Sequence, residues 1–479
     1  MAARPASTGF RIAALAATAS ALAACATFSP DGGTGPVALR AYQELGAATA
    51  KIQTTIDVAK ARERVAQLLA QPLTAAAAAQ IALLNNRGLQ ADYNELGIAE
   101  ADYVEATLPP ISPSVTVERA LTEFEFSIER ALAVSVIRLA TYGRRRDIAE
   151  KEFEAAQQRA IEATFRTAFD ARRGFYRAVA AKQRITFLTR AQATAEIAAD
   201  LTRRQGETGA QTKAVQARAA VFYAEVSAEL AQARLDAERE HEALIRVLGL
   251  WGRDTDTKLP KALPDLPPAL AVADVERQAL TRRVDLLAAR LRLDATARAL
   301  GLTEATRYVS LLDLTPRSTT TLTKEGGEIT RENTHGVELE LEIPIFDLGE
   351  TASRRARETY LQAMNRLTEL AVNIRSEARI GYIAYRATHD IALLYQNKII
   401  PLRQSIDEQT LLEYNGMLVD VFDLLASARD SILSNIAAID ARRDFFLAEV
   451  DFQAATIGGG GDREEESSRP VSVAEAAGG

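Results

Sequence analysis

The stretch Gly336-Val337-Glu338-Leu339-Glu340-Leu341-Glu342-Ile343-Pro344-Ile345-Phe346 places an apolar residue at every second position. Successive side chains of a β-strand point to opposite faces, so this period of two predicts a strand with one apolar and one acidic face. The apolar face carries Val337, Leu339, Leu341, Ile343 and Ile345, and the acidic face carries Glu338, Glu340 and Glu342. A soluble sheet packed on one side and a transmembrane barrel strand both show this pattern. The alternation therefore predicts a β-strand, but it does not distinguish a soluble sheet from a transmembrane barrel.

This strand is the second member of a predicted β-hairpin, and the first half of the chain holds a weaker copy. Tyr308–Thr323 precedes the strand, with a turn region at Glu325-Gly326-Gly327 between them. In the copy, Ser112–Glu118 is followed by Thr122–Arg130, where apolar residues alternate with polar ones that include Glu123 and Glu125. The copy is about a dozen residues shorter, so its strand limits are less sharply defined.

Long helical stretches follow each predicted hairpin. In the first half they run from Arg144 to about Gln205 and from about Gln211 to Leu248. In the second half they run from Thr351 to Tyr414 and from Val419 to about Ile457. The Thr351–Tyr414 stretch is interrupted at Gly381 and Pro401. A helix of 60 residues is about 90 Å long, whereas globular helices average about a dozen residues. Turns at Gly206–Gly209 and at Asn415-Gly416 therefore predict two long antiparallel helical hairpins.

The same order of elements occurs twice, which predicts a tandem repeat. Ala82–Ala91 and Ala279–Ala288 share the pattern Ala-Leu, five residues, Leu-x-Ala. The predicted divisions are a signal peptide at 1–24, a first repeat at 25–258, a Pro-rich linker at 259–269, a second repeat at 270–457 and a disordered tail at 458–479. Within the repeats, β-hairpins are predicted at about 110–143 and 307–349, and long helical hairpins at 144–250 and 350–457.

The first 24 residues have the features of a processing signal. Arg4 and Arg11 give a basic start, and residues 12–23 are an apolar segment too short to cross a bilayer as a helix. The segment ends in Leu22-Ala23-Ala24-Cys25, and Cys25 is the single cysteine. This ending resembles the lipobox of bacterial lipoproteins, which implies cleavage before Cys25 and attachment of lipid, including palmitate, to it. An ordinary signal peptide with a chance cysteine is the alternative.

Composition excludes several classes of function. One cysteine, three histidines and three methionines give no spacing that suits a metal site, so we expect no metal and no cofactor. A net charge of −7 argues against a nucleic-acid partner, which selects a basic surface. The sequence contains no recognisable nucleophile motif and no glycine-rich phosphate loop after a strand. We therefore expect no enzyme and no catalytic residue.

Several short motifs resemble the TolC-like outer-membrane efflux family, also called outer-membrane factors. In the first half they are Ala82–Ala91, Gly97–Ala101 with Pro109-Pro110, and Leu248-Gly249-Leu250; in the second half they are Pro344–Gly349, Tyr414-Asn415-Gly416 and Asp420–Leu425. Each is weak alone, but their order, duplication and position behind a lipobox make the resemblance specific. It covers roughly residues 37–458.

The resemblance implies a homotrimer that is mainly α with a β part. Each protomer would give four strands to one twelve-stranded transmembrane β-barrel and its long helices to a periplasmic α-barrel. The implied function is a passive exit duct of a tripartite efflux system, with a periplasmic adaptor and an inner-membrane transporter as partners. The implied location is the outer membrane, with a lipid anchor and most of the chain in the periplasm. The apolar strand face would then meet outer-membrane lipid.

The resemblance also implies roles for individual residues. Five strand acids would face the lumen: Glu338, Glu340, Glu342, Glu123 and Glu125. Asp420 and Asp423 match the family's periplasmic gate motif, and three copies would form a ring of carboxylates that binds cations. The alternative for this pair is that aspartates in a first helical turn merely favour the helix dipole. The adaptor-contact tips would include Gly206 and Gly209 in the first hairpin and Asn415, Gly416 and Met417 in the second.

The sequence is also compatible with two other functions. A lipid-anchored periplasmic adaptor or coiled-coil structural protein would also contain long helices. Adaptors usually have one helical hairpin between β domains, whereas this chain has two, each after a strand pair. This difference disfavours the adaptor function. A duct of the same fold that serves protein secretion is the second alternative.

Overall fold

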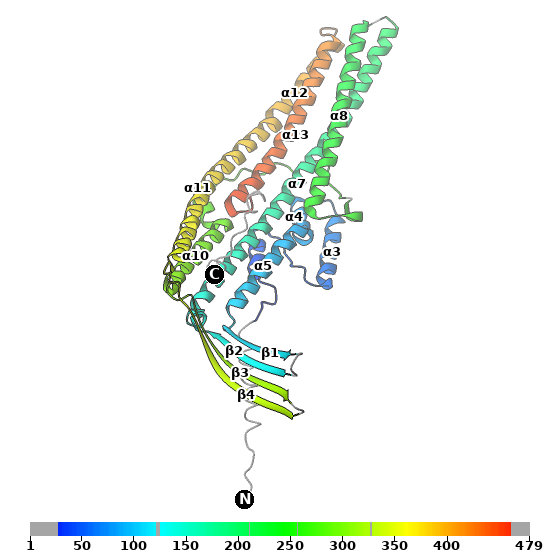
Figure 1. Ribbon diagram of the computed structural model, residues 1–479. Coiled ribbons are helices and arrows are strands. Elements are labelled where there is room, and N and C mark those ends of the chain that lie inside the picture. Colours follow the sequence, from blue (N-terminus) through cyan, green and yellow to red (C-terminus); the bar gives the residue numbers. More distant parts are fainter. Residues whose placement is uncertain (1–26, 121–124, 210, 256, 326–327, 461–479) are drawn as a thin grey trace.

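The computed structural model describes residues 27–460 except 121–124, 210, 256 and 326–327. Cys25, Glu123 and the part of the predicted disordered tail from residue 461 onward lie outside the described residues. Within the described part, long helices accompany one four-stranded sheet (Figure 1). This confirms the predicted fold class of a mainly helical chain with a four-stranded β part.

The first half contains the helices α2 to α8. They are α2 (Gly35–Leu45), α3 (Thr55–Leu69), α4 (Ala75–Asn85), α5 (Arg87–Ala106), α6 (Val136–Ala140), α7 (Tyr142–Glu207) and α8 (Lys213–Leu248). A 3-10 helix, η1 (Gly252–Thr255), precedes the linker. The second half contains α9 (Val275–Arg282), α10 (Val284–Thr306), α11 (Glu350–Leu394), the π-helical segment η2 (Tyr395–Ile399), α12 (Ile400–Asn415) and α13 (Val421–Ile457).

The sheet is antiparallel throughout, in the order β1-β2-β3-β4. Its strands are β1 (Ile111–Ala120), β2 (Glu125–Ser135), β3 (Leu311–Glu325) and β4 (Glu328–Glu342). The first two have 10 and 11 residues and the last two have 15 each, so the first hairpin is the shorter one. All four helical connections leave from the same end of the sheet, and Figure 1 shows the strands extending away from the helices.

The strand predicted at Gly336–Phe346 is displaced in the structure. β4 begins eight residues earlier, at Glu328, and ends at Glu342, so Ile343–Phe346 lie outside it. Pro344 has no amide proton to give to a strand ladder, which ends the pairing there. The chain then turns, with Leu348 N donating to the Pro344 carbonyl at 2.8 Å and the Asp347 carboxylate accepting from Gly349 N at 3.1 Å. This turn connects β4 to α11.

The interruption predicted at Gly381 is also wrong. α11 continues through Gly381, where a Cβ atom would lie 3.5 Å from the Cα of Phe452 in α13. A Cβ at this position would make only ordinary van der Waals contacts with α13, and the helix passes through the glycine without a break. The irregularity lies at η2, just before Pro401. Pro401 cannot donate the hydrogen bond to the carbonyl four residues earlier, and a π turn accommodates the loss.

The two helical hairpins, α7 with α8 and α12 with α13, extend from the body in the same direction, and their tips lie at the end opposite the sheet (Figure 1). α7 has 66 residues without a proline, and α8 has 36. α8 starts at Thr212, whose hydroxyl accepts from Val215 N, and stops at Gly249, which has φ +68°. A Cβ on Gly249 would lie 2.7 Å from the Asn85 carbonyl oxygen, so this stop also fixes α8 against α4.

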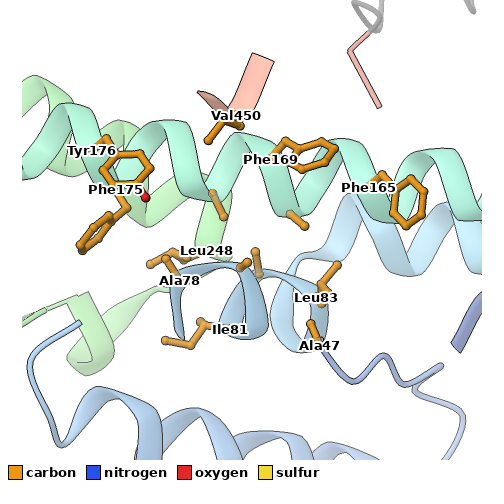
Figure 2. Packing of buried hydrophobic residues seen from close by; sticks show 14 of the residues in the cluster. Ala47, Ala78, Ile81, Leu83, Phe165, Phe169, Phe175, Tyr176, Leu248 and Val450 are labelled. Atoms are coloured by element: carbon orange, nitrogen blue, oxygen red, sulfur yellow. The ribbon is translucent and has the colours of Figure 1, made fainter. Parts of the chain in front are cut away.

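The largest core includes the contact between α7 and α4 (Figure 2). Phe165, Phe169 and Phe175 of α7 are buried there. On the α13 side, Tyr176 stacks on Phe446 with ring centroids 4.7 Å apart. A second, smaller cluster lies between α7, α8 and α13 nearer the tips and includes Phe222 and Leu230.

The linker between the repeats is hydrogen-bonded to side chains on one face of α11. His389 Nε2 lies 3.0 Å from the Pro267 carbonyl oxygen, and Tyr385 Oη accepts from Leu270 N at 3.1 Å. On the other side, Lys182 of α7 donates to the Leu259 carbonyl at 2.9 Å. The linker thus spans from the first repeat to the second and couples them at the level of the core.

Candidate functional site

The register of the sheet separates the strand residues into two chemically different faces. Residues directly opposite one another on paired strands share a face. Glu118 pairs with Ser127, Glu129 with Thr319, and Asp313 with Glu340. Following these pairs across all four strands gives one face of acidic, hydroxyl and small residues, called the polar face below. It includes the predicted lumen residues Glu125, Glu338, Glu340 and Glu342.

Every strand acid whose side chain the structure describes lies on the polar face: Glu118, Glu125, Glu129, Asp313, Glu328, Glu332, Glu338, Glu340 and Glu342. One basic residue, Arg317, shares this face and forms an ion pair with Glu338. Glu338 is therefore partly neutralised. Asp313 and Glu340 are instead cross-strand neighbours with like charge, and Asp313 Oδ1 is buried with no hydrogen-bond partner. Acidic side chains occur along the whole length of the polar face, from Glu328 at the hairpin end to Glu342 at the helical end.

The opposite face, called the apolar face below, is apolar in the half nearest the helices. Ile111, Val134, Leu314 and Leu339 form one row across all four strands. Pro316 pairs with Val337 and Leu312 with Leu341 in neighbouring rows. Leu339 is 64% exposed and Val337 is 70% exposed in the single chain. This face has no covering layer among the described residues, so a large apolar surface is left without a partner.

Both edges of the sheet are unpaired. β1 bonds only to β2 and β4 only to β3. Long exposed edge strands are ready to pair with another chain, and soluble proteins usually protect them. The sheet of a single chain is therefore incomplete on its apolar face and at both edges.

The first helical tip joins α7 to α8. Gly209 has φ +78°, a left-handed value that favours glycine, while Gly206 is still inside α7. A Cβ on Gly206 would lie 1.8 Å from Nε2 of Gln216, so glycine makes room for that side chain from α8. The two predicted tip glycines thus have different structural roles, a turn and a close contact.

The second tip places its strained residue where the sequence does not suggest it. Gly416 has φ −80°, whereas Met417 has φ +60°. Leu418 N donates to the Glu413 carbonyl at 2.8 Å, and Met417 N donates to the Tyr414 carbonyl at 3.0 Å. This pair of bonds is the Schellman arrangement, which usually has glycine in the left-handed position. Asn415 ends α12, and the Met417 side chain is 93% exposed.

Asp420 and Asp423 are brought together by a capping box at the start of α13. Asp420 Oδ1 accepts from Phe422 N at 2.7 Å and from Asp423 N at 3.1 Å. Asp423 Oδ2 accepts in return from Asp420 N at 3.4 Å. Both side chains are exposed, and each keeps a carboxylate oxygen free of these bonds. Helix capping is therefore one observed role of this pair, and it leaves both charges facing solvent.

The two hairpins touch near their tips. The Arg218 guanidinium of α8 lies 4.9 Å from the centre of the Phe422 ring in α13. Further along, Glu225 of α8 lies 3.7 Å from Arg429 of α13. The predicted gate pair thus adjoins a contact between the two repeats.

Among the described residues, no helix combines the length and apolar character needed to cross a bilayer. Within the same part of the chain, no group of three or more histidine, cysteine, aspartate or glutamate residues is placed to hold a metal ion.

No protein-family model matches the sequence, and the search of curated proteins finds no match. Solved structures do match. The CmeC outer-membrane channel of Campylobacter jejuni has a TM-score of 0.68 and 16% identity, covering 90% of this chain and 93% of that chain. The outer-membrane channel OprN has a TM-score of 0.67 and 17% identity, covering 91% and 97% respectively. The chain has the fold of these outer-membrane channels.

A third example is the open state of the Neisseria gonorrhoeae MtrE outer-membrane channel, with a TM-score of 0.63 and 16% identity over 80% of this chain and 88% of that chain. The match to the outer-membrane channel fold extends over both repeats and the sheet, because at least 80% of the chain is covered in each of the three comparisons. With identities of 16–17%, the likeness is one of fold.

Proposed function

We propose that this chain is the outer-membrane channel of a tripartite efflux system, and that it conducts substrates passively across the outer membrane. The observation that carries the proposal is the sheet, in which the register puts the described strand acids on one face and continuous apolar rows on the other. An apolar face suits lipid and a polar face suits a water-filled lumen. The shared fold with outer-membrane channels supports this assignment.

Closure of the barrel requires other copies of the chain. Unpaired strand edges are not tolerated in the hydrocarbon region of a membrane, so four strands alone cannot span it. Joining β4 of one copy to β1 of the next removes every edge under rotational symmetry. Three copies give the twelve-stranded barrel that we propose, with the long helices continuing as a periplasmic tube.

The helical tips are the proposed contacts with a periplasmic adaptor, which in turn would connect to an inner-membrane transporter. Both tips lie at the end opposite the sheet, where such a partner would meet the tube (Figure 1). Asp420 and Asp423, with their exposed charges, are the proposed gate ring. Cys25 is the proposed lipid attachment point.

The proposal is tested by locating the protein and measuring conductance. We expect the full-length protein in the outer-membrane fraction, as an oligomer that dissociates only on heating in detergent. In planar bilayers it should produce discrete conductance steps. A protein found as a soluble or inner-membrane monomer would support the adaptor or spacer alternative and exclude the channel. Resistance to small toxic compounds that is lost on deletion, with secreted proteins unchanged, would separate efflux from protein secretion.

A further inference from the structure

Three of the four arginines in the sheet lie on the face opposite the acidic residues. Arg119 pairs with Phe126, Arg130 with Ser318, and Arg331 with Leu322, which are all apolar-face positions. All three arginines are exposed. No described strand acid lies on this face. Arg317, on the polar face, is the exception, and it is paired with Glu338.

The position of these arginines along the strands is also uneven. Arg119 is one residue from the end of β1 and Arg331 is three residues from the start of β4, so both lie at the hairpin end, away from the helices. Arg119 and Arg331 share one row across the sheet, three strand spacings or about 14 Å apart. Arg130 flanks Ser318 near the middle of the strands, with His335 on the other side of that serine.

The three arginines have no ion-pair partner among the described residues, unlike Arg317. An arginine left exposed beside apolar rows is disfavoured in the hydrocarbon centre of a bilayer, and the cost falls toward the interface. Guanidinium groups bind phosphate oxygens in a bidentate manner. Basic residues at a membrane surface attract anionic lipids. On this face the three arginines lie at the middle or at the hairpin end, among apolar residues such as Val117 and Ile329, and none lies in the helical half. This one-sided placement suits the phosphorylated headgroups of one leaflet.

We propose that Arg119, Arg130 and Arg331 form a binding surface for the phosphate groups of anionic lipids in the leaflet at the hairpin end of the sheet. This rests on the proposed function, because the apolar face must meet a membrane. Such a binding surface would account for the presence of arginine on the apolar face, where no described strand acid lies. It also gives each copy its own lipid contacts around the outside of the barrel.

The test is retention of defined lipids by the full-length oligomer in neutral detergent, measured by native mass spectrometry. The probes are phosphatidylglycerol and phosphatidylcholine with the same acyl chains. We expect preferential retention of phosphatidylglycerol, weakened about fivefold by each of Arg119→Gln, Arg130→Gln and Arg331→Gln. The triple variant should lose about 100-fold, and added salt should weaken retention in the wild type. Arg317→Gln, on the polar face, is the matched control and should retain phosphatidylglycerol as the wild type does.

Equal retention of the two lipids, or loss in Arg317→Gln alone, would overturn the proposal. Displacement of phosphatidylglycerol by millimolar inorganic phosphate would also overturn it, because the site would then bind free phosphate rather than a lipid surface. Oligomer stability and conductance are measured on the same samples. A wild type that neither assembles nor conducts refutes the proposed function, whereas a conducting oligomer without lipid preference refutes only the lipid surface.

Discussion

Met417 occupies the left-handed position of the second helical tip, where glycine is the usual residue. Its side chain is almost fully exposed, so no packing contact offsets the backbone strain. Gly416, one residue earlier, has an ordinary negative φ. The sequence suggests Gly416 as the turning residue, because glycine is the common helix stop. The hydrogen bonds of the tip show that the chain turns one residue later.

Met417→Gly should stabilise this tip by about 0.5–1 kcal/mol, since a left-handed non-glycine residue costs about 1–2 kcal/mol and glycine returns part of that as chain entropy. Amide hydrogen exchange at Leu418, whose N–H bonds to Glu413, should slow by several-fold. Gly416→Ala is the control and should change little, because its Cβ would meet nothing closer than 3.4 Å. Faster exchange at Leu418 in Met417→Gly would show that the left-handed backbone at Met417 is not a source of strain.

The double variant Asp420→Asn with Asp423→Asn separates the observed capping role of this pair from its proposed gating role. Asparagine still caps a helix well, so stability should change little, while three copies lose six negative charges. We expect weaker cation selectivity and weaker block by divalent cations in bilayer recordings. The double alanine variant should show the same selectivity change together with a stability loss of about 1 kcal/mol per lost cap. Unaltered selectivity in the asparagine variant would leave capping as the only role.

Glu449 in α13 provides a pH-dependent prediction. Burial raises the pKa of its carboxyl, and the attraction of Arg172 offsets only part of that effect. The folded protein therefore binds this proton more tightly than the unfolded chain, and stability falls as pH rises through the raised pKa. Glu449→Gln should raise the unfolding midpoint at pH 7 and have little effect near pH 4. The exposed Glu238→Gln is the control; a larger gain at pH 4 than at pH 7 would contradict the sign.

Residue-scale roles were only partly accessible from the sequence. An aspartate three residues before another, at the start of an apolar run, is a recognisable helix-cap pattern, and the structure has that capping box. The clustering of basic residues on the apolar face depends on strand register across four strands, which period-two alternation within one strand does not define. The fastening of the linker by Tyr385 and His389 depends on which face of α11 it crosses, so it too required the structure.

At the scale of elements, the sheet faces predict opposite outcomes for neighbouring substitutions in β4. Leu339→Lys puts a charge on the apolar face, where a lysine at the bilayer midplane costs about 2–4 kcal/mol. Glu340→Lys, one residue later on the polar face, should be tolerated. Heat-stable oligomers in the outer-membrane fraction should be reduced in the first variant and normal in the second. Equal assembly of both would show that the apolar face does not meet lipid.

The helices were the most predictable elements, because long proline-free runs with helix-forming residues allow few alternatives. α8 and α13 each begin within two residues of the predicted positions, at Lys213 and Val421. The errors fall at glycine and proline. α11 continues through Gly381 without a break, and the effect of Pro401 appears in the preceding turn as η2. Pro344 ends β4 early because a ladder needs its missing amide proton.

At the scale of the whole molecule, a single chain leaves three surfaces unsatisfied: the apolar face of the sheet, the edge of β1 and the edge of β4. The low aromatic content is consistent with this, since the large buried side chains lie mainly in a central core and a smaller hairpin cluster, within a thin wall of helices. In the proposed ring of identical copies, all three surfaces would be satisfied, with lipid outside and water inside.

The measurement that tests this most directly is the native mass of the full-length protein extracted from the outer membrane. We expect a complex of three copies, because four strands from each then close a twelve-stranded barrel. A monomer, or a complex of two or four copies that still conducts ions, would contradict it.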